Sequence, residues 1–234
     1  MALQLGITPL ALTLKHPFKI ARGEESVAHT ALFRVRHDQL EGLGEGTPIE
    51  RYGESVETIA NYFARKPLTS GNPFRLEGLL DQAIPPAARA GLDMALHDLL
   101  GKELGRPLYE LLGLDPAATP LTSFTIGIAD PDTTLRKVAE IGDHPVLKVK
   151  LGLGTSAEQV ETIALIRERY TGAIRIDANE GWNVEEAIAI LRELDRFDIE
   201  FCEQPIPSGS PEGLRAVRER SPIPIVTDED SLDA

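Results

Sequence analysis

Four short apolar runs in the second half of the chain each end in an ionisable residue, and they recur at a nearly constant interval. Lys150, Asp177, Glu203 and Asp228 stand at the downstream ends of these runs, 27, 26 and 25 positions apart. One strand, one loop and one crossover helix fill such an interval, so the repeat predicts successive βα units of a parallel sheet. Because the carboxyl ends of parallel strands meet at one edge, these side chains are expected to share one face.

The remainder of the second half fits this pattern. Strands are predicted over 121–126, 146–151, 174–177, 199–203 and 223–228. N-cap and first-turn signals between them indicate helix starts, at Asp130-Pro131, Ser156 with Gln159, Asn183 with Glu186, and Ser210-Pro211. Five strands agree with a (β/α) barrel or with a doubly wound sheet, and the spacing alone leaves both open.

The first part of the chain favours strands. Apolar and polar residues alternate over 3–14 and apolar residues dominate 31–36, as in half-buried strands. Gly42, Gly44 and Gly46 have the spacing of a phosphate-binding loop, but no helical pattern opens directly on them. A hairpin arm is therefore the preferred interpretation.

Helical patterns follow these strands without alternating with them. They begin at Ser55 and at Pro85-Pro86, and a short one covers 108–112. Strands followed by helices are typical of an α+β domain. We therefore predict an α+β domain over residues 1–117 and an α/β domain over residues 118–234.

Composition limits the partners and the compartment. The 234-residue chain carries a net charge of −13, which argues against nucleic acid and anionic membrane as partners. The single cysteine, Cys202, excludes an internal disulfide and is interpreted as a small core residue. No apolar run approaches the ~18 residues of a membrane span, and no signal peptide is evident, so the cytoplasm is the expected location.

The strand-end residues carry a definite chemistry. Carboxylates are oxygen ligands, which a hard cation such as Mg²⁺ prefers, and the candidate ligands are Asp177, Glu203 and Asp228. Lys148 and Lys150 are two apart on one strand and so face the same side. Mutual repulsion and a nearby metal are expected to lower the pKa of each lysine toward that of a base. The alternatives are acids that cap the following helices and lysines in an ion-pair network.

These motifs resemble those of a known family. Lys148-Val149-Lys150, Asp177-Ala178-Asn179, Glu203-Gln204-Pro205 and Asp228-Glu229 are similar to the barrel motifs of the enolase superfamily, muconate-lactonizing subgroup. Residues 90–113 resemble the helix that leads into that barrel. The resemblance covers nearly all of the chain and implies an α+β capping domain followed by an α/β (β/α) barrel domain.

The resemblance also implies roles for individual residues. The family's Mg²⁺ ligands correspond to Asp177, Glu203 and Asp228. Lys150 would be the base that takes the proton next to a substrate carboxylate, and Lys148 would assist electrostatically. Asn179 and Glu229 would contact the ligands and hold them in position without binding the ion themselves. A lysine base with Mg²⁺ stabilising an ene-diolate is the general scheme of enolase-type sites, taken over with the resemblance.

Within the subgroup the chain is most similar to dipeptide epimerases of the L-Ala-D/L-Glu type. Residues 18–22 and 123–127 resemble their substrate-facing segments. This implies that Arg22 pairs with an acidic substrate side chain and that Thr125 lies at the rim of the first barrel strand. The expected partner is a small carboxylate, a dipeptide, and the expected assembly is a homo-oligomer.

Two other hypotheses stay open. A lyase or cycloisomerase, such as o-succinylbenzoate synthase or muconate cycloisomerase, would use the same lysines and acids. The third hypothesis is a metal-binding fragment without catalytic activity. About five of the eight strands of a barrel are expected here, and the family's sixth-strand lysine and eighth-strand acidic pair have no counterpart before Ala234. An incomplete barrel is therefore expected.

Overall fold

The computed structural model describes residues 3–68, 72, 75–80 and 83–232. The chain divides into two compact units. The first comprises Met1–Leu14 and Val27–Thr119, and the second comprises Lys15–Ser26 and Pro120–Ala234. Residues 15–26 thus belong to the unit formed mainly by the second half of the chain. The predicted domains, 1–117 and 118–234, do not contain this excursion.

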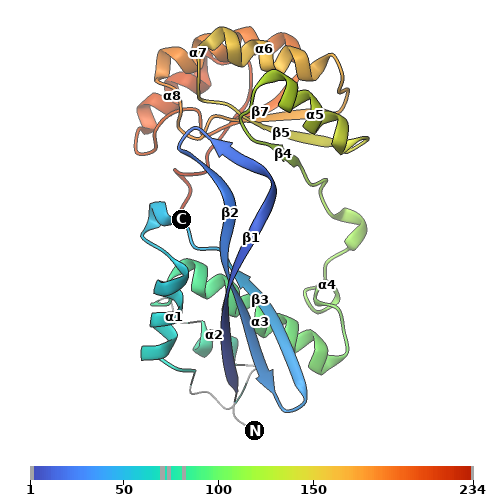
Figure 1. The fold of residues 1–234 in the computed structure, drawn as a ribbon, viewed down its shortest axis with the longest axis vertical. Helices are drawn as coiled ribbons and strands as arrows, with labels where there is room; N and C mark the ends of the chain where they lie inside the picture. The colour runs from blue at the N-terminus through green and yellow to red at the C-terminus, as the bar shows by residue number, and fades with distance from the viewer. Residues whose placement is uncertain (1–2, 69–71, 73–74, 81–82, 233–234) are drawn as a thin grey trace. The chain divides into compact units, whose positions relative to one another are not determined.

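The first unit contains helices and most of a three-stranded sheet, whose first two strands continue into residues 15–26 of the second unit (Figure 1). The strands, in the order β1-β2-β3, are β1 (Gln4–Ile20), β2 (Gly23–His37) and β3 (Leu40–Gly46). The helices are α1 (Val56–Arg65), α2 (Leu76–Leu79), α3 (Pro86–Leu104) and α4 (Leu108–Leu111), with 3-10 turns η1 (Glu50–Tyr52) and η2 (Pro116–Ala118). Strands β2 and β3 pair antiparallel, so the hairpin predicted around residues 42–46 is confirmed.

The three glycines of β3 allow α3 to lie directly on this strand. A Cβ atom on Gly42 would lie 2.0 Å from the carbonyl oxygen of Ala95, and one on Gly44 would lie 2.1 Å from that of Gly91. Such distances are far inside van der Waals contact, so any side chain would push the helix away. The glycine spacing therefore serves helix–strand packing.

The second unit contains a five-stranded parallel sheet in the order β4-β5-β6-β7-β8. Its strands are β4 (Phe124–Ile126), β5 (Val146–Lys150), β6 (Ala173–Asp177), β7 (Ile199–Glu203) and β8 (Ile225–Val226). The connecting helices are α5 (Pro131–Ile141), α6 (Ser156–Arg167), α7 (Val184–Leu194) and α8 (Pro211–Arg220), with the 3-10 turn η3 (Asp195–Phe197). Figure 1 shows these helices together on one face of the sheet. The five predicted parallel strands are confirmed.

Local signals explain where the helices of this unit begin. The Asp130 side chain accepts from the Thr133 amide and caps α5, and Asn183 with Glu186 forms the predicted capping box of α7. The capping box predicted at Ser156 and Gln159 is wrong by one residue, because Thr155 with Glu158 forms it instead. The two patterns overlap in the sequence, and the choice of the earlier one turns Gln159 into the interior, where it is buried.

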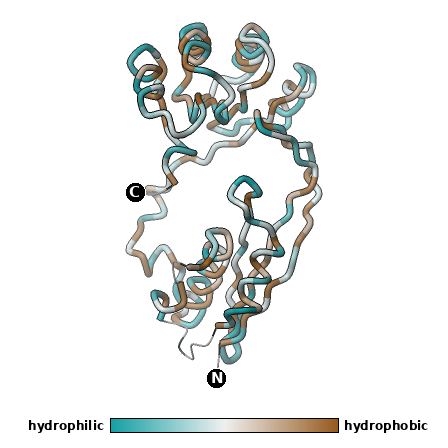
Figure 2. The backbone as a smooth tube through the Cα atoms, turned by 90° about the vertical axis from the view of Figure 1, so that its left-hand side faces the viewer, coloured by the Kyte–Doolittle hydropathy of each residue, from teal (hydrophilic) through white to brown (hydrophobic). Residues whose placement is uncertain are grey.

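The core of the second unit lies between the sheet and its helices. Leu147, Val149, Ile174 and Ile176 alternate with polar residues along β5 and β6, and all four are at most 1% exposed. They pack in one hydrophobic cluster with residues of α6 and α7, and Cys202 is buried in the same cluster, as predicted. Figure 2 shows hydrophilic and hydrophobic stretches alternating along the helices, as amphipathic packing requires.

The length and the composition of the helices decide whether any of them could cross a bilayer. Within the described residues, none combines the length and the apolar composition needed to cross a bilayer.

Candidate active site

Strand pairing brings the predicted site residues together at the carboxyl edge of the parallel sheet. Lys150 lies opposite Asp177 in the β5–β6 register, and Asp177 lies opposite Glu203 in the β6–β7 register. Lys148 is two residues before Lys150 and therefore projects to the same side, away from the helix-covered core. Three neighbouring strands thus present two lysines and two acids on one face.

The four side chains form one ion-pair network. Asp177 Oδ2 lies 2.6 Å from Lys150 Nζ and 2.9 Å from Lys148 Nζ. Lys148 Nζ also donates to Glu203 Oε1 at 2.7 Å. The Asp177 side chain is only 1% exposed, so its charge depends on these two ammonium groups. The alternative interpretation of the lysines as members of an ion-pair network describes this arrangement.

The pKa values of the two acids, Asp177 and Glu203, are shifted in opposite directions. Burial by itself would raise the pKa of Asp177, but hydrogen bonds and charge from Lys150 and Lys148 outweigh it, and the pKa is lowered. Burial raises the pKa of Glu203, and the neighbouring Asp177 charge adds to this rise against the opposing effect of Lys148. Asp177 is therefore the more firmly ionised of the pair.

The pKa of Lys148 is raised, and the expectation that it would be lowered is wrong for this arrangement. Burial lowers the pKa of the Lys148 ammonium group, but its hydrogen bonds to Glu203 and Asp177 outweigh burial. Mutual repulsion of the lysines and the charge of a nearby metal would each lower the pKa of Lys148. In the structure, two carboxylates instead stabilise its protonated form.

Asp228, the third predicted ligand, follows β8 and is exposed. Its backbone amide donates to Gln204 Oε1 at 3.0 Å. In the part of the chain that the structure describes, no three histidine, cysteine or acidic side chains are arranged so that they could hold one metal ion. The Mg²⁺ site formed by Asp177, Glu203 and Asp228 therefore stays a prediction.

Spare acceptor oxygens test whether a cation fits at this edge. Asn179 Oδ1 and Glu229 Oε2 are buried and have no hydrogen-bond partner among the described residues. Buried acceptors without donors are rare because each loses its hydration. Together with the carboxylates of Asp177 and Glu203 they are hard oxygen donors, the kind of ligand that Mg²⁺ prefers, so the residue types fit this ion.

Arg22 comes to this edge from residues 15–26. Its Nη1 donates to the Asn179 carbonyl oxygen and to Glu180 Oε2, both at 3.0 Å, and lies 2.6 Å from Glu229 Oε1. The approach to Glu229 is close enough for an ion pair, although it lacks hydrogen-bond alignment. Arg22, predicted to receive a substrate carboxylate, is paired with two carboxylates of its own chain.

Thr125 is the middle residue of β4, the first strand of the parallel sheet. It pairs with Lys148 in the β4–β5 register and is half-buried. Its side chain therefore shares the face of the lysines.

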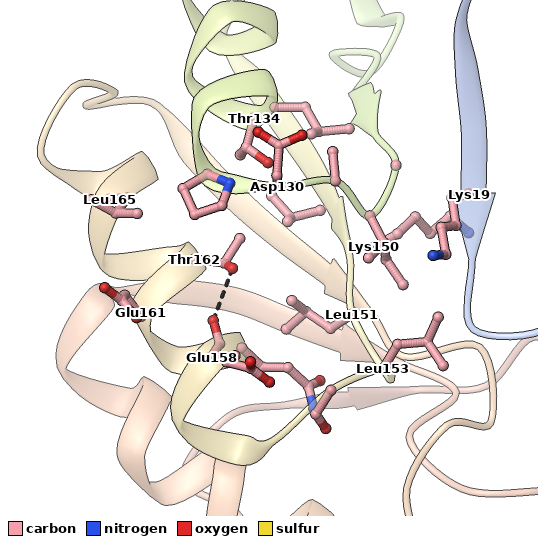
Figure 3. Close-up of a pocket in the computed structure, with 18 residues that line it drawn as sticks. Lys19, Asp130, Thr134, Lys150, Leu151, Leu153, Glu158, Glu161, Thr162 and Leu165 are labelled. Atoms are coloured by element: carbon pink, nitrogen blue, oxygen red, sulfur yellow. Dashed lines mark hydrogen bonds between the residues drawn. The ribbon is translucent and has the colours of Figure 1, made fainter.

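A cavity of about 430 Å³ opens beside this face, next to the N-terminal turns of α5 and α6. Figure 3 shows Lys150 and Lys19 on one side of it and Thr134, Thr162 and Leu165 on the helix side. Of the ion-pair network, Lys150 lines this cavity. Asp130, Glu158 and Glu161 also line this cavity, whereas the carboxylates that contact the two lysines, Asp177 and Glu203, do not.

Two buried glutamines support the site, and sequence reasoning missed both. Gln159 Oε1 accepts from the Gly152 amide at 2.8 Å and from Trp182 Nε1 at 3.0 Å, which ties together the loops after β5 and β6. Gln204 connects the loops after β7 and β8. The position of Gln204 directly after Glu203 is a signal that places it near the site. Gln159 lies inside a predicted helix, where its position also fits a capping box and hides its role.

Two family descriptions match the chain. The "Mandelate racemase / muconate lactonizing enzyme, N-terminal domain" matches residues 3–113, and the "Enolase C-terminal domain-like" family matches residues 133–233.

Named relatives are similar along the same length. An L-Ala-D/L-Glu epimerase of Bacteroides thetaiotaomicron is 35% identical over 229 residues, which cover 94% of this chain. An L-Ala-D/L-amino acid epimerase of a Maribacter species is 32% identical over 237 residues, which cover 98% of this chain. The chain spans 59% of the length of the first relative and 69% of the second.

Solved structures share the fold. A dipeptide epimerase of Enterococcus faecalis V583, complexed with Mg and L-Leu-L-Tyr, has a TM-score of 0.89 at 30% identity, covering 100% of this chain and 69% of that one. A muconate lactonizing enzyme of Pseudomonas fluorescens, complexed with muconolactone, has a TM-score of 0.88 at 27% identity, covering 97% and 66%.

Proposed function

Because this chain belongs to the enolase superfamily, in the group of mandelate racemase and muconate lactonizing enzyme, we propose that it carries the site of a Mg²⁺-dependent epimerase. The proposed substrate is a dipeptide such as L-Ala-D/L-Glu, and the reaction inverts an α-carbon next to a carboxylate. The observation that carries this proposal is the contact of Lys148 and Lys150 with one buried carboxylate, that of Asp177.

Asp177, Glu203 and Asp228 are the proposed ligands, with Asn179 and Glu229 behind them. Mg²⁺, when bound, supplies a Lewis acid that takes up the negative charge developing on the substrate carboxylate. The buried oxygens Asn179 Oδ1 and Glu229 Oε2, which have no hydrogen-bond partner among the described residues, support a cation at this edge. The solved dipeptide epimerase structure that contains Mg and a dipeptide supports the same choice of ion.

Lys150 is the proposed base. A lysine accepts a proton only when it is neutral, and in the structure Lys150 Nζ donates to Asp177 Oδ2 at 2.6 Å. In its neutral form, Lys150 would act as the base for the α-proton of the substrate. Its neutral Nζ then takes the proton from the α-carbon, and the electron pair of the C–H bond stays on the substrate, conjugated with the carboxylate. A second acid, on the opposite face of that carbon, returns a proton to it and completes the inversion.

Lys148 is proposed to stabilise charge and not to move the proton. It bridges Asp177 and Glu203, and its raised pKa keeps it positively charged. A fixed positive charge on the inner face favours the build-up of negative charge on the substrate.

The role of Arg22 bears on the substrate. Relatives are named for different second residues, L-Ala-D/L-Glu in one and hydrophobic dipeptides in another. Arg22 is proposed to bind a glutamate side chain by exchanging it for Glu180 or Glu229. Arg22→Met should then raise KM for Ala-Glu more than for a dipeptide with a neutral second residue. Equal effects on the two dipeptides would remove Arg22 from specificity.

The test of the reaction is α-proton exchange. L-Ala-L-Glu is incubated with the protein and MgCl₂ in D₂O, and loss of the α-proton signal is followed by ¹H NMR. Lys150→Ala should lower the exchange rate by about 100-fold or more, the usual worth of a positioned base. Lys148→Ala should slow turnover and keep Mg²⁺ binding. Undiminished exchange in the Lys150 variant would exclude it as the base.

Lys102→Ala is the matched control, since Lys102 is a solvent-exposed lysine of the first unit that pairs with Asp98. It should leave the exchange rate unchanged. Conversion of muconolactone without α-proton exchange of the dipeptide would instead favour the cycloisomerase hypothesis. A cytoplasmic location and a homo-oligomer remain proposals beside this function.

A further inference from the structure

Gln204 is a fully buried amide that the reaction proposed above does not use. Its Nε2 donates to the Ile206 carbonyl oxygen at 3.0 Å and to Asp230 Oδ2 at 2.7 Å. Its Oε1 accepts from the backbone amides of Asp228 at 3.0 Å and of Asp230 at 3.3 Å. These contacts use both donors and both acceptor sites of the amide, so its orientation is fully determined.

The backbone of Gln204 is held as tightly as its side chain. Its φ is +34°, in the left-handed region that residues with a Cβ rarely adopt. Its amide donates to the Val226 carbonyl oxygen at 2.9 Å, and its carbonyl oxygen accepts from the Glu180 amide at 2.9 Å. Such a conformation persists only where the surroundings determine it, and the surroundings here are the loops after β6 and β8.

Asp230 forms the other half of the contact. Its Oδ2 accepts from Gln204, and its Oδ1 accepts from the Gly209 amide at 2.7 Å. One carboxylate therefore joins the turn after β8 to the loop after β7. We call Gln204 and Asp230 together the loop clamp.

We propose that the loop clamp fixes the distance between Glu203 and Asp228, and that Gln204 is a positioning residue for the third Mg²⁺ ligand. Gln204 directly follows Glu203, while its side chain holds the amide of Asp228. The Asp228 side chain is exposed, so its position depends on its backbone and hence on the clamp. This inference rests on the proposed function, because it requires Asp228 to be a ligand.

The experiment measures Mg²⁺ affinity of the 234-residue chain by calorimetric titration in Gln204→Glu, in Asp230→Asn and in the double variant. Gln204→Glu places a carboxylate against Asp230 and the Ile206 carbonyl oxygen. We expect the Kd to rise by about tenfold to a hundredfold, as when the support behind a metal ligand is lost. The double variant restores a hydrogen bond of reversed polarity between the two side chains, so it should regain much of the lost affinity.

Ser221→Ala is the matched control. Ser221 Oγ bonds both the amide and the carbonyl oxygen of Ile223, at the opposite end of β8. This variant should lower the melting temperature and leave the Kd for Mg²⁺ unchanged. A rise in Kd as large as that of Gln204→Glu would mean that general destabilisation accounts for both, and the clamp would be rejected.

Asp228→Asn separates the clamp from the proposed function. If this variant weakens Mg²⁺ binding but Gln204→Glu does not, the clamp alone is overturned. If the wild-type chain shows no saturable Mg²⁺ binding, or Asp228→Asn leaves the Kd unchanged, then Asp228 is not a ligand and both proposals fall. If Asp228→Asn and Gln204→Glu both raise the Kd for Mg²⁺, and the double variant Gln204→Glu/Asp230→Asn lowers it again, the clamp is supported.

Discussion

Asp177 and Glu203 occupy paired positions on adjacent strands, yet the pKa values of their carboxyl groups move in opposite directions. The difference lies in the lysines. Asp177 receives both ammonium groups, while Glu203 receives only Lys148 and faces the charge of Asp177. At the scale of single residues, ionisation of Asp177 therefore stabilises the folded chain, whereas ionisation of Glu203 destabilises it.

Asp177→Asn should lower the free energy of unfolding at pH 7 by about 3 kcal/mol, because two lysines lose a buried anionic partner. The folded-state pKa of Asp177 lies below the ordinary value of 3.8. Its stabilisation is therefore complete above that value and is lost as the pH falls through the lower folded-state pKa. The variant should show a shallower acid dependence than the wild type in urea denaturation at a series of pH values.

Glu203→Gln should behave in the opposite way. The folded-state pKa of Glu203 is raised above its ordinary value of 4.5, so stability is highest below 4.5 and declines as the pH rises through the raised value. At pH 7 the neutral amide avoids that loss, and the variant should be at least as stable as the wild type. A loss as large as that of Asp177→Asn would show that the ion pair with Lys148 dominates instead.

At the scale of elements, the packing of α3 on β3 depends on glycine. Gly44→Ala should destabilise the first unit by about 2 kcal/mol or more, because the new Cβ meets backbone that has no room to shift. Gly78→Ala, in α2 of the same unit, is the matched control, since nothing lies within 4 Å of a Cβ built there, and it should not lower stability. Denaturation followed by circular dichroism compares the two.

In the second unit, the loops after β5 and β6 depend on hydrogen bonds to the buried side chain of Gln159. Gln159→Leu leaves the Gly152 amide and Trp182 Nε1 buried without an acceptor, which should cost about 3 kcal/mol. Trp182 is the only tryptophan of the chain, so its fluorescence reports the change directly. Glu161→Leu, at an exposed position of the same helix, should leave both stability and emission nearly unchanged. A similar loss in that variant would point to helix propensity and not to the lost contact.

Most of these elements were predictable because their signals are local. The caps at Ser55, Asp130 and Asn183 and the start of α3 at Pro86 follow from the identity of one or two residues. The same locality explains the error at α6, where two overlapping capping patterns compete. The roles of Gln159 and Gln204 were not predictable, because each joins loops that are far apart in the sequence.

At the scale of the whole chain, the proximity of Lys148, Lys150, Asp177 and Glu203 was predictable because strand periodicity fixes both their face and their edge. The excursion of residues 15–26 into the second unit was not. Arg22 lies 157 positions from Asn179, to whose carbonyl oxygen it donates, and no local pattern encodes such a contact. The resemblance to a family suggested that Arg22 belongs near the site, but the carboxylates with which it pairs emerge only from the structure.

The two units also have separate hydrophobic cores. In the part of the chain that the structure describes, one core draws its buried residues from 3–99 and the other from 126–223, with none in common. Each unit can therefore lose its packing without removing apolar contacts from the other core. Trp182 belongs to the second core, so its fluorescence follows that unit alone, whereas circular dichroism follows both.

Gly44→Ala should consequently separate the two signals. The substitution weakens only the first core, so it should shift the early part of the circular dichroism transition to lower urea concentration while the Trp182 midpoint stays in place. Asp177→Asn should move the Trp182 midpoint and provides the reciprocal control. If Gly44→Ala moved both signals together, the units would unfold as one cooperative body, and stability would have to be assigned to the chain as a whole.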